Sequence, residues 1–504
     1  MKKILTFDIG TTAVKTAVFD SNLKAVTQTR EEYELITGSK GQVELDAEQY
    51  WQAVLRGARS MLSFPGISRD DICAIAVTTQ GETLIPVDQD GHALRNAIVW
   101  LDGRAVRESE FINSQINPDE FYSRTGIPEC NGLCPVSKLL WIKNNEPEVY
   151  RQACKFLLLE DYIIFRLTGR FVTEKSLLCT TGYFDIQTDT LWDDMLTLIG
   201  IDKDKIPELL DCGTKVGPLT PAAAASLGLR TDTLVTTAAM DQTAGAVGAG
   251  NFRPGIVTET TGTALALAAT AANPDFCHPL RMTLYRHIEK NLYLYLPVCM
   301  TAGIVLKWFK DEFCAAETEQ AAGEGRSVYA VLDEAAERTP LMSNGLILLP
   351  YLAGTIQPDN NPLAKGVFFG VGLDTKRHHF IRAIFEAIAF MLRENIEFIE
   401  NVNKTKITEI RSLGGGANSS VWLQIKADVN QKHILTMVEN ECTSLGAAIL
   451  AAVAIGWFPA AEQAAEAANS IRSSYTPDIE KGMAYDEGYA TYQAIYARLK
   501  TLFK

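Results

Sequence analysis

The sequence lacks the marks of a secreted, disulfide-rich protein. Its ten cysteines are scattered, and no pair has the Cys-x-x-Cys spacing typical of zinc ligands. The first three residues, Met-Lys-Lys, lead directly into residues 4–8, with neither the apolar stretch nor the small-residue cleavage site of a signal peptide. We therefore expect buried thiols and a reducing, cytoplasmic location.

Long apolar runs and an excess of basic residues are also missing. The longest apolar helix candidate, residues 445–458, ends at Pro459 and is too short to cross a hydrocarbon layer of about 30 Å. Lys and Arg number 47 against 61 Asp and Glu, which gives a net charge of -14. Because nucleic-acid binding requires clustered basic residues, this balance argues against a polyanionic partner. We expect neither a membrane nor a nucleic-acid partner.

A low-complexity linker is absent as well. The chain has 504 residues, more than one hydrophobic core usually serves, so two or three domains that pack together are expected. Gly and Pro in residues 251–255 suit a hinge between halves. We place an N-terminal domain at 1–248 and a C-terminal domain at 249–504, with a homodimer as the expected oligomeric state.

What is present is a strand-rich N-terminus. Residues 3–8 and 14–20 predict a hairpin, residues 25–35 a further strand, 48–62 a helix and 74–79 a buried strand. This order differs from the strict βα alternation of a doubly wound fold and predicts a mixed α/β protein. The same pattern restarts at residues 255–269, which indicates a degenerate repeat. Residues 408–454 then predict strand, glycine turn, helix, strand and helix.

The turn of the first hairpin places small residues after a carboxylate. Backbone N–H groups at such a turn can face a phosphate, and Asp8 could hold Mg²⁺ directly or through water. An ordinary hairpin turn would look the same in isolation, but Thr261-Gly262-Thr263 repeats the pattern in the second half. The candidate residues of the first turn are Asp8, Gly10, Thr11, Thr12 and Lys15.

Asp241 follows a predicted strand, residues 234–237, and precedes a helix rich in small residues. In a functional interpretation it is the general base that accepts a proton from a hydroxyl. In a purely structural interpretation it is the N-cap of that helix.

A glycine turn joins a strand to a helix further along the chain. It has neither the Gly-Lys-Ser/Thr of a Walker motif nor the Gly-x-Gly-x-x-Gly of a dinucleotide loop. Bare backbone at this turn could still approach a base or a phosphate. The residues concerned are Gly414, Gly415, Gly416 and Ser419.

Two further blocks combine amide, acid and aromatic groups, which suit a polyhydroxylated ligand. For Asp102 the alternative is a surface ion pair with Arg104. The candidate substrate contacts are Gln80, Gly81, Glu82, Trp100 and Asp102.

Taken together, these motifs resemble the FGGY carbohydrate kinases over nearly the whole chain. The resemblance rests on residues 8–20, 80–104, Asp241 with the glycines that follow it, 260–263, 349–354, 366–370 and 414–428. It implies two actin-like (ribonuclease H-like) ATPase domains with a catalytic cleft between them, the N-terminal one binding sugar and the C-terminal one binding ATP. By motif position, Asp8 resembles the family's Mg²⁺-associated carboxylate and Asp241 its catalytic base, with both expected at the metal. The expected nucleotide contacts are Thr11, Thr12, Thr263, Gly303, Lys307, Gly415 and Ser419.

The substrate implied by the resemblance is a small sugar or polyol. Residues 349–354, 366–370 and 100–104 resemble xylulokinases, whereas Gln80-Gly81-Glu82-Thr83 resembles the Gln-Arg-Glu-Thr of glycerol kinases without its Arg. We expect a ketose kinase of the xylulokinase type, acting on D-xylulose. The alternatives are L-xylulose, ribulose, gluconate, erythritol or glycerol as acceptor, and, from another class, a non-catalytic actin-like sugar-binding regulator.

Overall fold

The computed structural model describes residues 2–356 and 359–504. The chain folds into two compact units, each assembled from segments that are distant in the sequence. Unit 1 contains the chain as far as Phe252, together with Asp275–Leu294 and Glu441–Ser470. Unit 2 contains Arg253–Pro274, Tyr295–Asn440 and Ile471–Lys504. The boundary between the compact units is therefore not a single point near residue 250, because two segments of the second half belong to unit 1.

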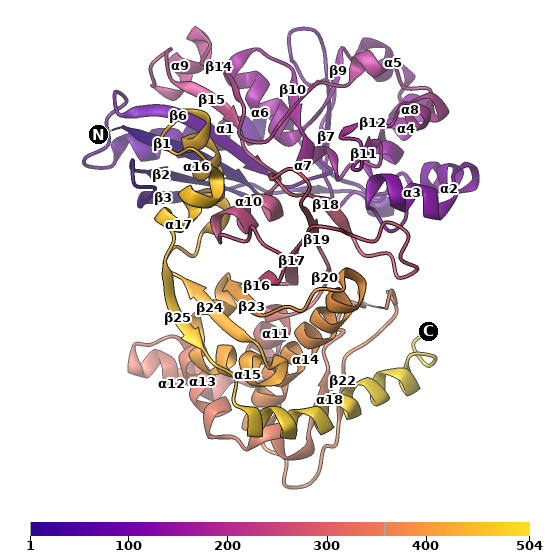
Figure 1. The fold of residues 1–504 in the computed structure, drawn as a ribbon, viewed down its shortest axis with the longest axis vertical. Coiled ribbons are helices and arrows are strands. Elements are labelled where there is room, and N and C mark those ends of the chain that lie inside the picture. Colours follow the sequence, from indigo (N-terminus) through magenta and orange to yellow (C-terminus); the bar gives the residue numbers. More distant parts are fainter. Residues whose placement is uncertain (1, 357–358) are drawn as a thin grey trace. The chain divides into compact units, whose positions relative to one another are not determined.

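Unit 1 is built on a six-stranded mixed sheet (Figure 1). β1 and β2 form the expected antiparallel hairpin, in which Asp8 is opposite Lys15. β6 lies parallel to β1 on the other side, and β15 lies parallel to β6. The sheet order is β14 (Lys215–Pro218), β15 (Leu234–Thr237), β6 (Ile72–Thr79), β1 (Lys3–Ile9), β2 (Ala13–Phe19) and β3 (Ala25–Glu32).

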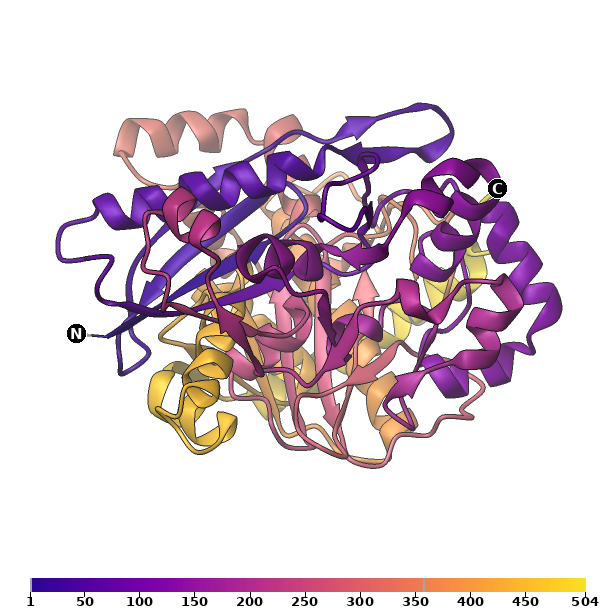
Figure 2. The same ribbon diagram turned by 90° about the horizontal axis from the view of Figure 1, so that it is seen from above.

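Both faces of this sheet are covered, so β1 is buried at every residue and β6 at all but Cys73, and most of their side chains are apolar. Alternate residues point to opposite faces. In β1, Leu5 and Phe7 pack in the core that contains α1 (Ala47–Ser63), whereas Ile4 packs in the core that contains α16 (Cys442–Ala454). Figure 2 shows the same strands, in indigo, from above. The helices α6 (Leu159–Thr168) and α9 (Pro221–Leu227) contribute to the first core, and α10 (Asp241–Gly248) and α17 (Ala461–Ala468) to the second.

The helices α10 and α16 approach each other through glycines. A Cβ atom on Gly446 would lie 1.9 Å from the carbonyl oxygen of Ala244, and one on Gly248 would lie 1.9 Å from that of Cys442. A backbone carbonyl cannot rotate away from an added methyl group, as the end of a flexible side chain can. This contact ties residues 441–470 to the N-terminal sheet and explains why that segment belongs to unit 1.

The Gly446→Ala variant is therefore expected to be destabilised. Overpacking of this kind costs about 1–3 kcal/mol in a rigid core, because the helices must separate to admit the methyl group. Urea unfolding followed by circular dichroism measures the loss. Gly217→Ala is the control, since a Cβ at Gly217 meets nothing within 4 Å. Equal stability of the two variants would contradict the close approach of α10 and α16.

Unit 2 repeats the plan of unit 1. β16 and β17 form an antiparallel hairpin, and β23 lies parallel to β16, as β6 lies parallel to β1. The degenerate repeat expected from the sequence is thus confirmed. The sheet contains, in order, β17 (Leu265–Ala271), β16 (Ile256–Thr261), β23 (Glu409–Leu413), β24 (His433–Met437) and β25 (Ile471–Tyr475), with β20 (Val298–Cys299) paired to β17.

The helices of unit 2 include one of 27 residues, α14, which packs against α13 and α15. Within residues 2–356 and 359–504, no helix is long and apolar enough to cross a bilayer. The helices are α11 (Gly303–Phe313), α12 (Ala315–Glu324), α13 (Val328–Arg338), α14 (Arg377–Asn403), α15 (Ser420–Asn430) and α18 (Ile479–Leu499).

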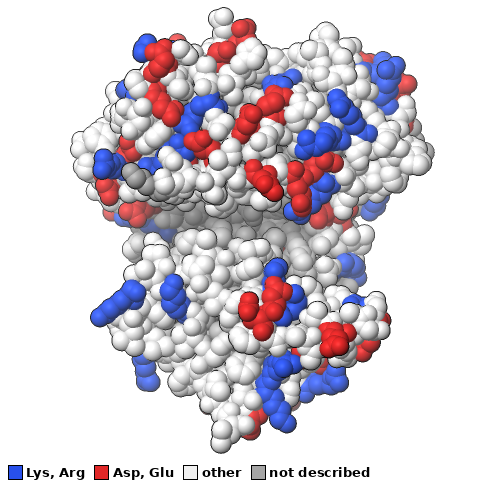
Figure 3. Space-filling model, turned by 180° about the vertical axis from the view of Figure 1, so that it is seen from behind, with Lys and Arg blue, Asp and Glu red and all other residues white. Residues whose placement is uncertain are grey.

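The surface carries charges of both signs. On the face drawn in Figure 3, acidic and basic side chains are interspersed. All ten cysteines are thiols. The expectation that all of them are buried is wrong for Cys277, which is exposed, and for Cys73, Cys154 and Cys212, which are half-buried.

Candidate active site

The parallel strands of unit 1 bring three candidate segments to one edge of the sheet. Asp8 ends β1, the Gln80 segment follows β6, and Asp241 follows β15. Because carboxyl ends of adjacent parallel strands meet at the same edge, residues separated by more than 200 positions become neighbours. The Gln80 backbone N–H donates to the carbonyl of Ile9 at 3.1 Å, which joins two of these segments directly.

Asp241 follows two residues whose backbones are hydrogen-bonded to neighbouring segments. The Thr78 hydroxyl donates to the carbonyl of Ala239 at 2.6 Å, and the Met240 N–H donates to the Ser176 hydroxyl at 2.9 Å. Asp241 is the first residue of α10 rather than its cap, which is Met240. Its Oδ1 accepts the N–H of Gln242 at 2.6 Å. The position of this carboxylate is therefore set by rigid elements.

The carboxylates at this edge have raised pKa values, chiefly because they are buried. Burial, followed by the charges of Asp8 and Glu82, raises the pKa of Asp241 to about 7, although the Gln242 N–H opposes the shift. Burial also raises the pKa of Asp8 to about 6, while Lys15 opposes the shift and Glu441 adds to it. Lys15 forms an ion pair with Glu441 at the start of α16. A carboxyl whose pKa is near neutrality suits a general base.

The Glu82 segment faces the same edge. Glu82 has a left-handed backbone with φ of 56°, and its N–H donates to the Thr180 hydroxyl at 3.3 Å. Burial raises the pKa of Glu82 to about 7 although Lys138 opposes the shift. The pKa of the Tyr285 phenol is raised by burial and further by the charges of Glu82 and Asp241, so this buried tyrosine is within the electrostatic reach of both carboxylates.

Trp100 connects the Glu82 segment to the first hairpin. Its indole N–H donates to the Thr11 hydroxyl at 3.0 Å, and its backbone N–H donates to the Thr83 hydroxyl at 3.1 Å. The remaining residues predicted at this turn are Gly10, Thr12 and Lys15; Thr12 is exposed and the other two are half-buried.

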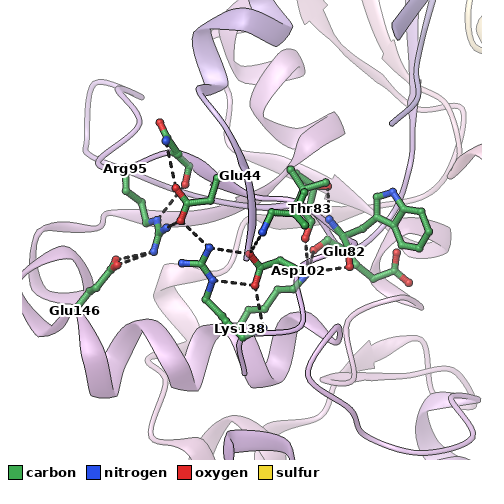
Figure 4. Close-up of polar contacts among 12 residues, drawn as sticks. Glu44, Glu82, Thr83, Arg95, Asp102, Lys138 and Glu146 are labelled. Atoms are coloured by element: carbon green, nitrogen blue, oxygen red, sulfur yellow. Dashed lines mark hydrogen bonds and ion pairs between the residues drawn. The ribbon is translucent and has the colours of Figure 1, made fainter. Parts of the chain in front are cut away.

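The environment of Asp102 differs from that expected of a sugar ligand. Its side chain has no exposed surface, and both oxygens are occupied by Arg104 and the N–H of Val43 (Figure 4). Burial raises the pKa of Asp102, but the hydrogen bonds from Arg104 outweigh burial and hold it below its usual value. The pair with Arg104 is buried, not a surface ion pair. Asp102 therefore anchors the Trp100 segment, and the interpretation of this residue as a substrate contact is wrong.

Unit 2 contains a cavity of about 550 Å³, within the size range of sites for small ligands. Four segments line it: the β16–β17 turn, the start of α11, α13, and the turn between β23 and α15. The lining residues are Thr261, Gly262, Thr263, Gly303, Ile304, Leu306, Lys307, Ser327, Tyr329, Ala330, Asp333, Gly415, Gly416, Asn418, Ser419 and Trp422.

Bare backbone forms one end of this cavity. A Cβ on Gly303 would lie 2.4 Å from the carbonyl of Gly262, and one on Gly416 would lie 2.7 Å from the Thr261 side chain. Gly414, just before the turn, has φ of 74° and is not a lining residue. The first N–H groups of α11 donate to the carbonyls of Gly262 and Thr263, so the start of this helix offers a phosphate its positive dipole end.

Two predicted side chains in the cavity have protein partners. Lys307 is exposed and pairs with Asp311 at 2.6 Å. The Ser419 hydroxyl caps α15 and donates to Asp333 at 2.7 Å. Burial raises the pKa of Asp333 to about 6, although this hydrogen bond opposes the shift.

Several residues escaped the sequence-based predictions. Tyr285 lies in β18 (Leu284–Arg286), and Lys138 is a lysine within an apolar helix, α4 (Pro135–Asn145). A buried ion pair joins Lys426 to Glu259 at 2.7 Å beneath the β16–β17 turn. Neither local spacing nor residue type distinguishes these residues from ordinary core positions, since their partners are distant in the sequence, 38 residues away for Lys138 and Trp100 and 167 for Lys426 and Glu259.

Comparisons with known proteins agree with this arrangement. The xylulose kinase of Bacillus subtilis (strain 168) is 31% identical over 502 residues, covering 100% of this chain and 98% of that protein. The gluconokinase of the same organism is 30% identical over 454 residues, covering 90% and 88%. The crystal structure of ligand-bound xylulose kinase from Lactobacillus acidophilus superposes with a TM-score of 0.89 at 27% identity, covering 100% and 99%.

Two family models account for most of the sequence. Residues 3–248 match the N-terminal domain of the FGGY family of carbohydrate kinases, and residues 256–455 match its C-terminal domain. The fold of the two units matches solved xylulose kinase structures over the whole chain. The chain belongs to the FGGY family of carbohydrate kinases and is a sugar kinase that uses ATP.

Proposed function

We propose that this kinase phosphorylates a small ketose of the xylulose type, with Asp241 as the general base. The observation that carries the proposal is the placement of Asp241 beside Glu82 and Tyr285 at the edge where β1, β6 and β15 end. A carboxylate there can accept the proton of one bound hydroxyl, while amide, acid and phenol groups form hydrogen bonds with the other hydroxyls of the sugar. The proposed sugar contacts are Gln80, Gly81, Glu82, Trp100 and Tyr285.

The proposed reaction transfers the γ-phosphoryl group of ATP to the acceptor hydroxyl. The acceptor hydroxyl loses its proton to a carboxylate oxygen of Asp241 as its oxygen forms a bond to the γ-phosphorus of ATP. The bond between that phosphorus and the bridging oxygen breaks, and ADP leaves with the electron pair. Catalysis then rests on positioning and on electrostatic stabilisation of the transferring group.

The cavity of unit 2 is the proposed ATP site. Its glycine-rich end, with Thr263 and Gly303, suits the phosphates, and Tyr329 and Trp422 offer apolar surface to the base. Thr11, Thr12 and Lys15 of unit 1 are proposed to contact the transferring phosphoryl group, because the first hairpin presents backbone N–H groups next to Asp8.

Mg²⁺ fits the acidic edge of unit 1. The charge of Asp8 disfavours ionisation of Asp241, and Mg²⁺ sites commonly use one or two carboxylates with substrate phosphates. These two residues would hold the ion, which supplies positive charge against the phosphates. In the described part of the chain, only Asp88, Asp90 and His92 bring three potential ligand groups together, on a partly exposed turn.

The charge of the proposed sugar site favours a neutral ketose over gluconate. Glu82 and Asp241 present carboxylates, and the nearest buried cation, Lys138, has its N–H groups directed at backbone carbonyls. The carboxylate of gluconate would meet repulsion there without a free cation to receive it.

A coupled assay of ADP release tests the choice of substrate. D-xylulose, L-xylulose, ribulose, gluconate, erythritol and glycerol are compared at equal concentration with Mg²⁺-ATP. We expect D-xylulose to give the highest kcat/KM. A higher value with gluconate would overturn the ketose assignment, and no turnover above the ATP-only rate with any acceptor would favour a non-catalytic sugar-binding protein.

A further inference from the structure

Lys138 is a fully buried lysine at an unusual place. It lies in α4 among apolar neighbours and has no exposed surface. Its ammonium group donates to three backbone carbonyls, those of Val99 at 2.9 Å, Glu82 at 3.1 Å and Trp100 at 3.4 Å. An ammonium has three N–H groups, so this geometry uses all of them.

The three carbonyls belong to two separate segments of the proposed sugar site. One segment is the turn after β6 that contains Glu82, and the other contains Val99 and Trp100, which follow β8 (Ala97–Ile98). Figure 4 shows the Lys138 side chain reaching both the Glu82 and the Asp102 segments. The two segments are also joined by the Trp100 N–H, which donates to the Thr83 hydroxyl at 3.1 Å, and by the pairing of β7 (Leu84–Val87) with β8 through Leu84 and Ile98.

The cost of burying this cation implies a specific role. A lysine without exposed surface is favourable only when its hydrogen bonds and neighbouring charges compensate for lost hydration. Burial lowers the pKa of Lys138 to about 8, while the charges of Glu82 and Asp102 favour the protonated form. Glu82 itself holds a left-handed backbone, a conformation that a residue with a side chain adopts only when its surroundings impose it.

We infer that Lys138 is a positioning residue that clamps the Glu82 and Trp100 segments together and so sets the orientation of the sugar site. It touches no substrate in this role. Its ammonium fixes the backbone from which the Glu82 carboxylate and the Trp100 ring project, and Asp102, held by Arg104, fixes the far end of the Trp100 segment. The inference rests on the proposed function of this edge as the sugar site.

The test compares steady-state constants of Lys138→Met with those of the wild type, using Mg²⁺-ATP and D-xylulose. Without the ammonium, three carbonyls lose their donor, and the Glu82 and Trp100 backbones are held less firmly against each other beyond the β7–β8 pair. We expect the sugar KM to rise about 10- to 100-fold, because this factor corresponds to the loss of a hydrogen bond to a charged group. The ATP KM should stay within about twofold of the wild-type value.

Lys143→Met is the matched control. Lys143 lies on the same helix and also donates to backbone carbonyls, those of Ile199 at 3.0 Å and Gly200 at 2.7 Å, but these lie outside the proposed sugar site. We expect it to leave both KM values unchanged. A purely structural role for Lys138 would lower the active fraction in Lys138→Met and likewise leave both KM values as in the wild type, which would overturn the inference.

Thr83→Val is the second variant, to be measured if Lys138→Met does not fold. This near-isosteric change removes the hydrogen bond from the Trp100 N–H that joins the two segments, and also the one from the Gln80 amide, so the sugar KM should again rise while the ATP KM does not. A wild-type sugar KM in Thr83→Val would then overturn the inference. If the wild type phosphorylates no acceptor of the panel, the proposed function is wrong. If the wild type is active and the variants keep its sugar KM, only the inference about Lys138 is wrong.

Discussion

The Asp241→Asn variant is expected to lose about 10²- to 10⁴-fold in kcat, the range that general-base catalysis supplies. Asparagine keeps the shape of the side chain and can still accept the Gln242 N–H through its oxygen, but it cannot take up a proton at neutral pH. Steady-state assays with saturating D-xylulose and ATP measure the loss.

The matched control for Asp241→Asn is Asp232→Asn. Asp232 is exposed in unit 1, where it pairs with Arg230. Its replacement should leave kcat within about twofold, since surface pairs contribute roughly 0–1 kcal/mol to stability and Asp232 precedes β15 whereas Asp241 follows it, at the other end of the strand. An Asp241→Asn variant with kcat near that of Asp232→Asn would show that another group takes the proton.

The Lys426→Met variant is expected to lose about 3–5 kcal/mol in the free energy of unfolding of unit 2, because it leaves the Glu259 carboxylate buried without its cation. Neither side chain has exposed surface. The Lys426 ammonium also donates to the Thr261 hydroxyl at 2.8 Å, and that hydroxyl donates to Glu259 at 2.7 Å. The pair therefore supports the β16–β17 turn from below.

Urea unfolding followed by tryptophan fluorescence measures this loss, since the Lys426 ammonium lies 5.1 Å from the centre of the Trp422 ring. The double variant Lys426→Met with Glu259→Leu should recover much of the stability, because no unpaired charge remains in the core. A single variant within about 1 kcal/mol of the wild type, or a double variant less stable than the single one, would contradict this account of the pair.

The sequence predicted the parts of the fold that depend on local pattern. Alternating and continuous apolar runs located the first hairpin, β6 and α1, and the restart at residue 255 located the second hairpin. These elements follow from side-chain period and turn chemistry, which a single segment contains. The division into compact units could not be read in this way, because it depends on the approach of α16 to α10 through Gly446 and Gly248.

The candidate site was predictable to a similar extent. Asp8 is the last but one residue of β1 and Asp241 follows β15, and the parallel pairing through β6 explains why they reach the same edge. Asp102 was misassigned because sequence shows its neighbour Arg104 but not the burial of the pair. Lys138 could not be identified at all, since its role depends on carbonyls that any residue carries and that only the folded chain brings together.

The most direct test of the central claim is a single-turnover experiment that separates chemistry from binding. Wild type and Asp241→Asn are each saturated with D-xylulose, mixed with Mg²⁺ and γ-labelled ATP below the enzyme concentration, and quenched at increasing times. The account predicts rapid transfer of label to the sugar by the wild type, and transfer slower by about 10²-fold or more in a variant that still binds both ligands. Transfer by Asp241→Asn at the wild-type rate would contradict the assignment of Asp241 as the base.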